Sequence, residues 1–197
     1  MKKFAAAALV AALSASAFAA QGDILARFRI TNVNPQTSVD STLAALNVDV
    51  NDDTIPEVDF TYMFTDNIGA ELILGTSKHD VTSSLGHTAS VRVLPPTLTA
   101  QYHFSPEGQF RPYVGAGINY TRFYSFKDTS GLDLSIKKNS FGPALQVGVD
   151  IPVTKNIFVN FDVKKLWIKT KVKAGGVDAG TLDIDPLVTS VGIGTKF

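Results

Sequence analysis

The chain has 197 residues, of which 45% are hydrophobic and 18% are charged, so it is long enough for one domain and too apolar for a disordered protein. Its 18 basic residues balance its 18 acidic residues, and the lack of a basic excess argues against a nucleic-acid partner. The absence of cysteine excludes disulfides, a thiolate nucleophile and any cysteine-ligated metal site.

The N-terminus carries the pattern of a secretory signal peptide. Residues 1–3 give a positively charged start, residues 4–13 form an apolar stretch, and residues 17–19 give the small-x-small pattern of a cleavage site. We therefore predict a signal peptide over residues 1–19 and a mature domain over residues 20–197. Beyond Ala20 no apolar run approaches the roughly 18 to 20 residues of a spanning helix, so any membrane role would have to depend on strands.

Strand periodicity dominates the rest of the chain, because apolar residues alternate with small or polar ones over many segments. In chain order we predict eight strands, over residues 23–33, 57–65, 68–75, 97–104, 110–121, 141–151, 156–171 and 182–197. An even number of antiparallel strands can close into a barrel, and eight are enough to do so.

The connections between these strands alternate in length. Three are tight and rich in turn formers, at residues 66–67, 105–108 and 152–156. Four are predicted to be long polar loops, over residues 34–55, 76–90, 125–138 and 172–181. An up-and-down meander places all the short turns at one end and all the long loops at the other, and this asymmetry is typical of bacterial outer-membrane barrels.

In each predicted strand alternate residues form a more polar face and a more apolar face, which we call the polar and the apolar parity. The composition of the polar parity indicates which face points inward. It carries glycines and a set of charges of both signs, which suits the narrow lumen of a small membrane barrel, whereas the apolar parity would face lipid. We expect the charges to pair with one another inside the lumen, because an unpaired buried charge costs several kcal/mol. This lumen charge cluster comprises Arg27, Arg29, Glu57, Asp59, Glu71, Arg111, Asp150 and Asp162, with Lys164 beside them.

Aromatic residues gather where the predicted strands end. Phe64, Tyr102, Phe104, Phe110 and Phe197 lie beside the short turns, and Tyr120, Tyr124, Phe141 and Trp167 lie toward the long loops. Two such groups are expected for the aromatic girdles of a barrel at the two membrane interfaces.

Four blocks of the sequence resemble the outer membrane protein W family. They are FTYM and TDNIGAEL at residues 60–63 and 65–72, LPPTLTAQY at 94–102, FRPYVGAGINY at 110–120, and QVGVD at 146–150. The resemblance implies an all-β fold, an eight-stranded antiparallel up-and-down transmembrane β-barrel in the outer membrane of a Gram-negative bacterium. It also implies passage of small hydrophobic molecules, with an exit sideways through the barrel wall in the alkane-transport members.

The resemblance further implies candidate residues inside the lumen. In the family apolar side chains close the lumen partway, and Ile73 occupies a matching position, with Met63 on the neighbouring strand as a second candidate. The facing position is Lys164, which departs from a purely apolar constriction. Toward the loops, Val91, Val93, Pro95 and Phe123 could line an apolar vestibule, or they could only pack under the loops.

Proline interrupts two of the predicted strands, at Pro95-Pro96 and at Pro112. Each proline removes a backbone donor, so a neighbouring acceptor in a closed barrel is left without its ladder partner. We hypothesise a lateral opening near these prolines, and the alternative is an ordinary bulge or strand start.

Catalytic and metal sites are weakly supported. His79, Asp80, Ser83 and Ser84 in the second predicted loop superficially offer a serine, histidine and acid set, but no ordering motif accompanies them. His79 and His87 lack a third ligand with recognisable spacing. His103 is expected to be a hydrogen-bonded structural histidine in the lumen. We therefore predict no enzyme activity, no metal and no cofactor.

Three readings of function follow from the sequence. The first is a barrel that passes small hydrophobic solutes, the second is a structural or surface-receptor barrel without transport, and the third is a soluble periplasmic ligand-binding barrel. Partners would be outer-membrane lipid and lipopolysaccharide, whose phosphates the lysine-rich stretch over residues 164–173 could meet. The sequence does not indicate an oligomeric state, and residues 40–46 could form one helical turn in the first loop.

Overall fold

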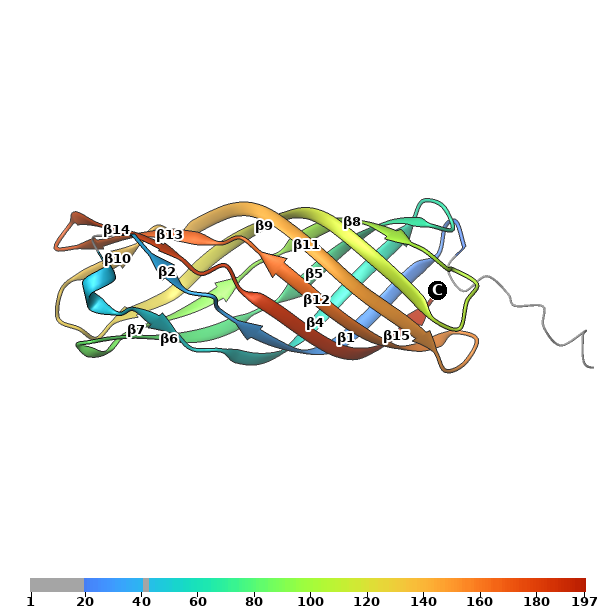
Figure 1. The fold of residues 1–197 in the computed structure, drawn as a ribbon, viewed down its shortest axis with the longest axis horizontal. Coiled ribbons are helices and arrows are strands. Elements are labelled where there is room, and N and C mark those ends of the chain that lie inside the picture. The colour runs from blue at the N-terminus through green and yellow to red at the C-terminus, as the bar shows by residue number, and fades with distance from the viewer. Residues whose placement is uncertain (1–19, 41–42) are drawn as a thin grey trace, which may run out of the picture.

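The computed structural model describes residues 20–40 and 43–197, so the predicted signal peptide over residues 1–19 lies outside the described residues. The described chain forms an elongated cylinder of tilted strands (Figure 1). Each strand of the cylinder is antiparallel to both neighbours, and pairing of the first with the last closes the barrel. In order around the wall these strands are β1 (Ile24–Asn34), β4 (Asp53–Met63), β5 (Ile68–Gly75), β8 (Thr97–His103), β9 (Arg111–Asp128), β11 (Asn139–Pro152), β12 (Ile157–Leu166) and β15 (Leu187–Lys196). The predicted eight-stranded antiparallel barrel is confirmed.

Seven further strands in the described part of the chain extend the wall at one end. They are β2 (Ser38–Val39), β3 (Asp49–Val50), β6 (Ser77–Ser83), β7 (Gly86–Leu94), β10 (Leu134–Ile136), β13 (Lys169–Ala174) and β14 (Val177–Asp183). They fall into two groups, β10-β13-β14-β2 and β3-β6-β7 on the outer part of β9. Figure 1 shows this extension end opposite the turn end, where the three tight turns and the C-terminus lie.

The prediction of four long polar loops was therefore wrong for much of their length. The physical reason is that polarity can invert along a strand while the inward parity stays the same, as it does in β1. In β1 the outward residues change from Phe28 and Ile30 to Asn32, whereas the inward residues change from Arg29 to Val33. The strands of the extension are short and interrupted, and their outward residues are polar. In the sequence such strands resemble polar loops. The predicted helical turn is a 3-10 turn, η1 (Ala44–Leu46), while residues 41–42 lie outside the described residues.

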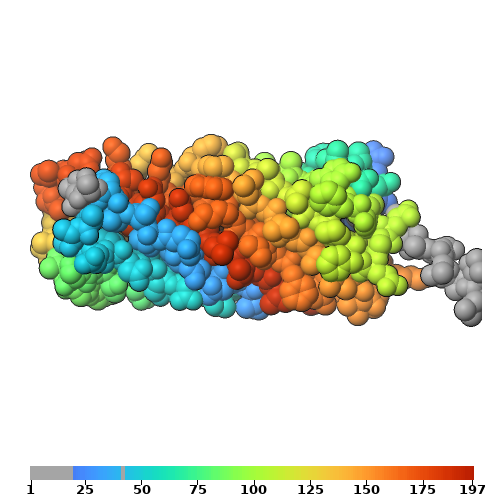
Figure 2. Space-filling view, in the orientation of Figure 1, coloured from blue at the N-terminus to red at the C-terminus, as the bar shows by residue number. Residues whose placement is uncertain are grey.

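The outward face of the barrel is apolar between two groups of aromatic side chains. Phe28, Phe60 and Leu98 are among the large apolar residues that stay exposed on this face. At the turn end Phe64, Tyr102, Phe104, Phe110 and Phe197 are exposed, as are Tyr120 and Phe141 toward the extension, where Tyr124 and Trp167 are partly exposed. In the space-filling view side chains cover the lattice of strands (Figure 2). A soluble domain would bury this surface, whereas a barrel in lipid exposes it.

No helix in residues 20–40 or 43–197 is long and apolar enough to cross a membrane.

Glycines let neighbouring strands approach closely in the wall. A Cβ atom on Gly117 would lie 1.9 Å from the Leu98 carbonyl oxygen, and one on Gly142 would lie 2.0 Å from that of Trp167. Both neighbours are backbone atoms, Leu98 in the adjacent strand β8 and Trp167 just beyond the end of β12, and a backbone atom cannot rotate away as a side chain can. The narrow barrel therefore requires glycine at these two positions.

We predict that Gly117→Ala destabilises the barrel by about 1 to 3 kcal/mol, because its methyl group forces the wall apart. The measurement is the folded fraction after denaturant titration, read from heat-modifiable migration on a gel. Gly75→Ala is the matched control, since its nearest neighbour is the Ile55 Cδ1 atom at 3.1 Å, the end of a flexible side chain. Equal stability of the two variants would contradict the prediction.

Candidate functional site

Two arginines from β1 occupy the centre of the lumen. The Arg27 guanidinium lies 3.0 Å from Asp59, 3.3 Å from Glu71 and 2.7 Å from Asp150. Its Nη1 atom also donates a hydrogen bond of 2.8 Å to the Thr61 hydroxyl. This side chain is buried and links β1 to β4, β5 and β11 across the lumen.

Arg29 extends the same set of ion pairs toward the extension. Its guanidinium lies 3.1 Å from Glu57, 3.0 Å from Asp59 and 3.1 Å from Glu71. The Lys164 ammonium from β12 lies 2.8 Å from Glu57 and 2.9 Å from Asp162. We call the eight side chains Arg27, Arg29, Glu57, Asp59, Glu71, Asp150, Asp162 and Lys164 the ion network.

Neutral groups complete the ion network. The Tyr113 hydroxyl donates to Asp162 at 2.7 Å, and the Gln146 amide donates to Glu71 at 2.7 Å and to Asp162 at 2.8 Å. Gly148 makes room for the Tyr113 ring, because a Cβ atom there would lie 2.4 Å from that ring. The middle of the lumen is thus filled by side chains that hold one another in place.

Between the ion network and the turn end, the lumen contains a small apolar cluster. Leu25, Met63 and Phe158 form a small buried cluster there. Met63 pairs with Gly69 in the register of β4 and β5, whereas Ile73 pairs with Asp59 four residues away, about 13 Å along the strand. The structure therefore does not bring Met63 and Ile73 together, which are two of the three candidate constriction residues.

Two further residues of the lumen lie toward the turn end. The Arg111 Nε atom donates a hydrogen bond of 2.7 Å to the Gly108 carbonyl oxygen in the turn before β9. The His103 Nε2 atom lies 3.1 Å from the Gln101 side-chain oxygen, and its ring stacks on Tyr113. His103 is a buried, hydrogen-bonded histidine, as predicted.

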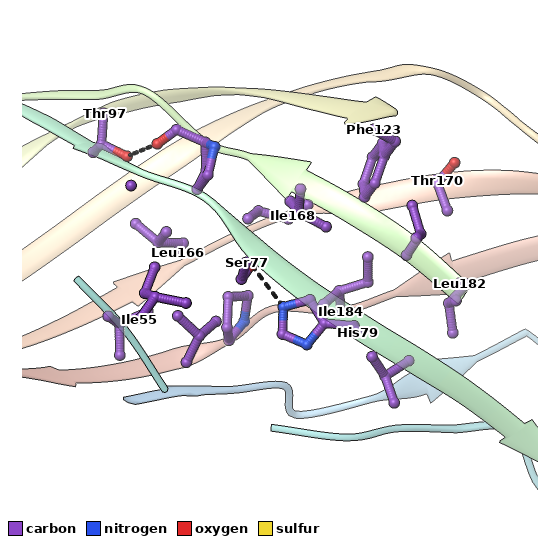
Figure 3. Close-up of a pocket in the computed structure, with 18 of the residues that line it drawn as sticks. Ile55, Ser77, His79, Thr97, Phe123, Leu166, Ile168, Thr170, Leu182 and Ile184 are labelled. Atoms are coloured by element: carbon purple, nitrogen blue, oxygen red, sulfur yellow. Dashed lines mark hydrogen bonds between the residues drawn. The ribbon is translucent and has the colours of Figure 1, made fainter. Parts of the chain in front are cut away.

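An apolar cavity of about 70 Å³ lies on the other side of the ion network, toward the extension (Figure 3). We call it the upper cavity. Its floor is formed by Ile73 together with Glu57 and Lys164 of the ion network. In Figure 3 side chains from several strands point into this space. The apolar part of its wall includes Val50, Ile55, Val91, Val93, Pro95, Phe123, Leu166, Ile168, Leu182, Ile184 and Val188.

The predicted vestibule residues Val91, Val93, Pro95 and Phe123 all line this cavity. Sequence reasoning missed the residues that the last two barrel strands and their extensions contribute, such as Leu166, Leu182 and Val188. The inward parity of residues 162, 164, 166 and 168 continues without a break from charged to apolar, and it could have indicated the first of them.

A second apolar cavity, of about 120 Å³, lies nearer the tip of the extension. It includes Leu43 and Leu46 at η1, and it shares Val81, Phe126 and Leu182 with the upper cavity. Apolar surface therefore continues from the tip of the extension down to the ion network.

His79 lies in β6 and not in a loop, and its ring lines the upper cavity. Its Nδ1 atom lies 2.8 Å from the Asn51 carbonyl oxygen and its Nε2 atom 2.8 Å from the Ser77 hydroxyl. The Ser83 hydroxyl instead contacts Thr88 at 2.9 Å. The structure therefore does not assemble the serine, histidine and acid set. In the described part of the chain no three histidine or acidic side chains are grouped as metal ligands.

The wall beside the upper cavity contains a gap in its hydrogen-bond ladder. Pairing of β5 with β8 ends at Ile73 opposite Thr97, and pairing of β6 with β7 begins at Ser77 opposite Val93, in the same register. Residues 74–76 and 94–96 between these pairs belong to neither ladder. Pro95 and Pro96 contribute no donor here, and Gly75 and Pro95 both line the upper cavity. Pro112, in contrast, sits in regular pairing opposite Val149 near the turn end.

Comparisons with known proteins agree with this architecture. The model of the OmpW family matches residues 20–197. The outer membrane protein W of Salmonella typhi is 42% identical, with both chains covered in full. The dibenzothiophene metabolism operon protein PahQ of Pseudomonas aeruginosa is 32% identical over 76% of this chain and 74% of its own. The crystal structure of OprG from Pseudomonas aeruginosa matches with a TM-score of 0.77 at 28% identity, over 90% of this chain and 97% of that one. These names describe outer-membrane and operon proteins and not enzymes.

We predict that Arg27→Met destabilises the barrel by about 3 to 5 kcal/mol, because it removes the cation 2.7 Å from the buried carboxylate of Asp150 and leaves the buried Asp59 with Arg29 alone. The measurement is denaturant unfolding of the barrel in detergent. Lys171→Ala is the control, since Lys171 and Asp178 are 3.9 Å apart with side chains 64% and 57% exposed. That change should cost less than about 1 kcal/mol. Comparable losses in both variants would count against a stabilising ion network.

Proposed function

The chain belongs to the outer membrane protein W family, and from this premise we propose that it passes small hydrophobic molecules from outside the cell into the outer membrane. The observation that carries the proposal is the upper cavity, which is apolar, ends on a charged floor and borders the gap in the wall. An outer-membrane barrel of this kind places its short turns in the periplasm, so the extension end faces outside.

The entrance is the apolar surface inside the extension. An apolar solute gains roughly 25 cal/mol for each Å² that it removes from water, so it is drawn from the tip toward the upper cavity. The name of the relative PahQ links that protein to the metabolism of dibenzothiophene. Dibenzothiophene is an aromatic compound that dissolves poorly in water, and it exemplifies the class of solute that this lining would accept.

The ion network makes a straight passage to the periplasm unfavourable. Eight charged side chains fill the lumen below the upper cavity, and their carboxylates and cations are paired with one another. An apolar solute would have to separate these pairs and would offer them no hydrogen bonds in return. The floor therefore stops the solute and leaves the wall as its exit.

The gap in the ladder is the proposed exit. Opening a wall elsewhere would break backbone hydrogen bonds in contact with hydrocarbon, at several kcal/mol for each unsatisfied group. At residues 74–76 and 94–96 those bonds are already missing. Leu74 and Leu94 face outward at this height, and the Tyr120 amide of the outer aromatic group donates to the Pro96 carbonyl oxygen at 3.0 Å. The gap thus opens where the hydrocarbon of the membrane begins.

We predict that Ile73→Trp lowers the uptake of small apolar solutes at least several-fold, because the indole would fill the floor of the upper cavity. Uptake is measured as the initial rate with a panel of apolar solutes in cells or in proteoliposomes that contain lipopolysaccharide. Leu72→Trp is the matched control, since Leu72 lies on the same strand beside Ile73 but faces lipid and belongs to the intact ladder below the gap. If empty membranes take up every solute as fast as membranes with the barrel, the transport proposal fails, and a structural or receptor role replaces it.

A disulfide across the gap tests the exit separately. The chain has no native cysteine, and continuing the register places Leu74 opposite Pro96 on the outward face. We predict that the double variant Leu74→Cys with Pro96→Cys loses most of its uptake when oxidised and regains it when reduced.

The matched control is Leu72→Cys with Leu98→Cys, a cross-strand pair of the intact ladder just below the gap. Its oxidation should leave uptake unchanged, because the wall there is already closed by hydrogen bonds. Unchanged uptake through the oxidised Leu74 and Pro96 variant would reject an exit at this gap, even where Ile73→Trp still blocks the cavity.

A further inference from the structure

We propose that the outer surface beside β9 and β10 holds a phosphate group of the lipopolysaccharide that surrounds the barrel. The centre of this site is a notch of about 410 Å³ in the wall of the extension. Its polar lining is Arg122, Tyr124, Ser125, Ser135 and Lys138, and it contains no carboxylate.

The notch exists because the two groups of extension strands separate here. β9 pairs with β11 up to Arg122 opposite Asn139, and above this point β9 continues with β7 while β10 pairs with β13. The Phe123 amide still donates to the Lys138 carbonyl oxygen at 2.8 Å. Ser125 then has a φ of +50°, in the left-handed region, at the irregularity in the pairing of β7 with β9. The backbone thus turns away and leaves the notch open on the outside.

The notch lies at the height where lipid phosphates are expected. Tyr120 and Phe141 are direct cross-strand partners, with 47% and 65% of their surface exposed, and they belong to the outer aromatic group. Arg122 and Asn139 form the next pair with the same outward orientation, two residues or about 7 Å farther out. Aromatic girdles mark the interface of a barrel with the membrane, so Arg122 reaches the layer of headgroups just above it.

Further cations flank the notch on both sides and form what we call the basic arc. The arc contains exposed residues on β6, β7, β9, β13 and the segment before β11: Lys78, Arg92, Arg122, Lys127, Lys137, Lys138, Lys169, Lys171 and Lys173. Two of these cations have a carboxylate within 4.0 Å in the described part of the chain, Lys78 with Asp80 at 3.7 Å and Lys171 with Asp178 at 3.9 Å. The remaining cations of the arc are available to an external anion.

The pairing of strands places one pair of these like charges directly opposite each other. Lys78 and Arg92 are direct cross-strand partners on the outward face. Like charges in that position destabilise a sheet unless an anion lies between them. A guanidinium with a nearby ammonium is also the combination that binds phosphate well, since arginine can form two parallel hydrogen bonds to it. The pairing of Lys78 with Arg92 is therefore better explained by a phosphate-bearing neighbour than by the stability of the sheet.

This assignment revises the lysine-rich stretch predicted over residues 164–173. Lys164 points into the lumen, and Lys165 donates to the Asp185 carbonyl oxygen, so neither belongs to the arc. Arg92, Arg122 and Lys138 come from distant parts of the sequence and were not predicted.

The test is binding of purified lipopolysaccharide to the folded barrel in detergent, for the wild type and for the double variant Arg122→Gln with Lys138→Gln. We expect the double variant to bind at least tenfold more weakly. Removal of the lipid A phosphates from the lipopolysaccharide should weaken binding to the wild type by a similar factor and should hardly affect the double variant. Lys155→Gln, a change in the turn over residues 152–156 at the other end of the barrel, is the control and should bind as the wild type does.

Several outcomes would overturn the proposal. Equal binding of phosphorylated and dephosphorylated lipopolysaccharide to the wild type would show that the acyl chains alone are recognised. Unchanged binding by the double variant would place the site elsewhere. Phosphatidylglycerol vesicles or inorganic phosphate that bind as tightly as lipopolysaccharide would reject its assignment as the ligand. Heat-modifiable migration of each variant confirms that the barrel is folded in every arm.

Discussion

The two arginines of β1 determine how the whole lumen is divided. An eight-stranded barrel is too narrow to hold water around buried charges, so each charge requires a partner on another strand. Arg27 and Arg29 supply this by reaching Asp59 on the neighbouring strand β4, Glu71 on β5 beyond it, and Asp150 across the lumen. The resulting ion network fixes the strands relative to one another and separates an apolar cluster at the turn end from the upper cavity. Every proposed route of a solute depends on that separation.

Much of the fold could be predicted from the sequence because every strand of a closed barrel alternates inward-facing and outward-facing residues. The inward parity is continuous from Arg29 to Val33 in β1 and from Asp162 to Ile168 beyond β12, and only its polarity changes. Where the outward side meets lipid, the contrast between the two faces is strong and the strands were predicted. Where the outward side meets water, the difference in polarity between the two faces is smaller and the strands are shorter. The strands of the extension were therefore mistaken for loops.

The candidate site was predicted in part, and the remainder depends on contacts between distant segments. Val91, Val93, Pro95 and Phe123 follow from parity and line the upper cavity. The position of His79 cannot be predicted from parity, because its partner Asn51 comes from a segment that was predicted as another loop. Similarly, no local pattern shows that Met63 and Ile73 lie on opposite sides of the ion network, since that depends on the register between β4 and β5.

The gap in the wall and the change in polarity occur at the same height, and this coincidence has a physical reason. Above the gap the interior is apolar and the exterior is wet, so a solute is retained inside. Below it the interior is charged and the exterior is hydrocarbon, so a solute is favoured outside. The preferred side of the wall for an apolar molecule therefore reverses between Val93 and Ile73. The proposed passage through the wall is needed only at this level, and Pro95 and Pro96 interrupt the ladder there while the register on either side is preserved.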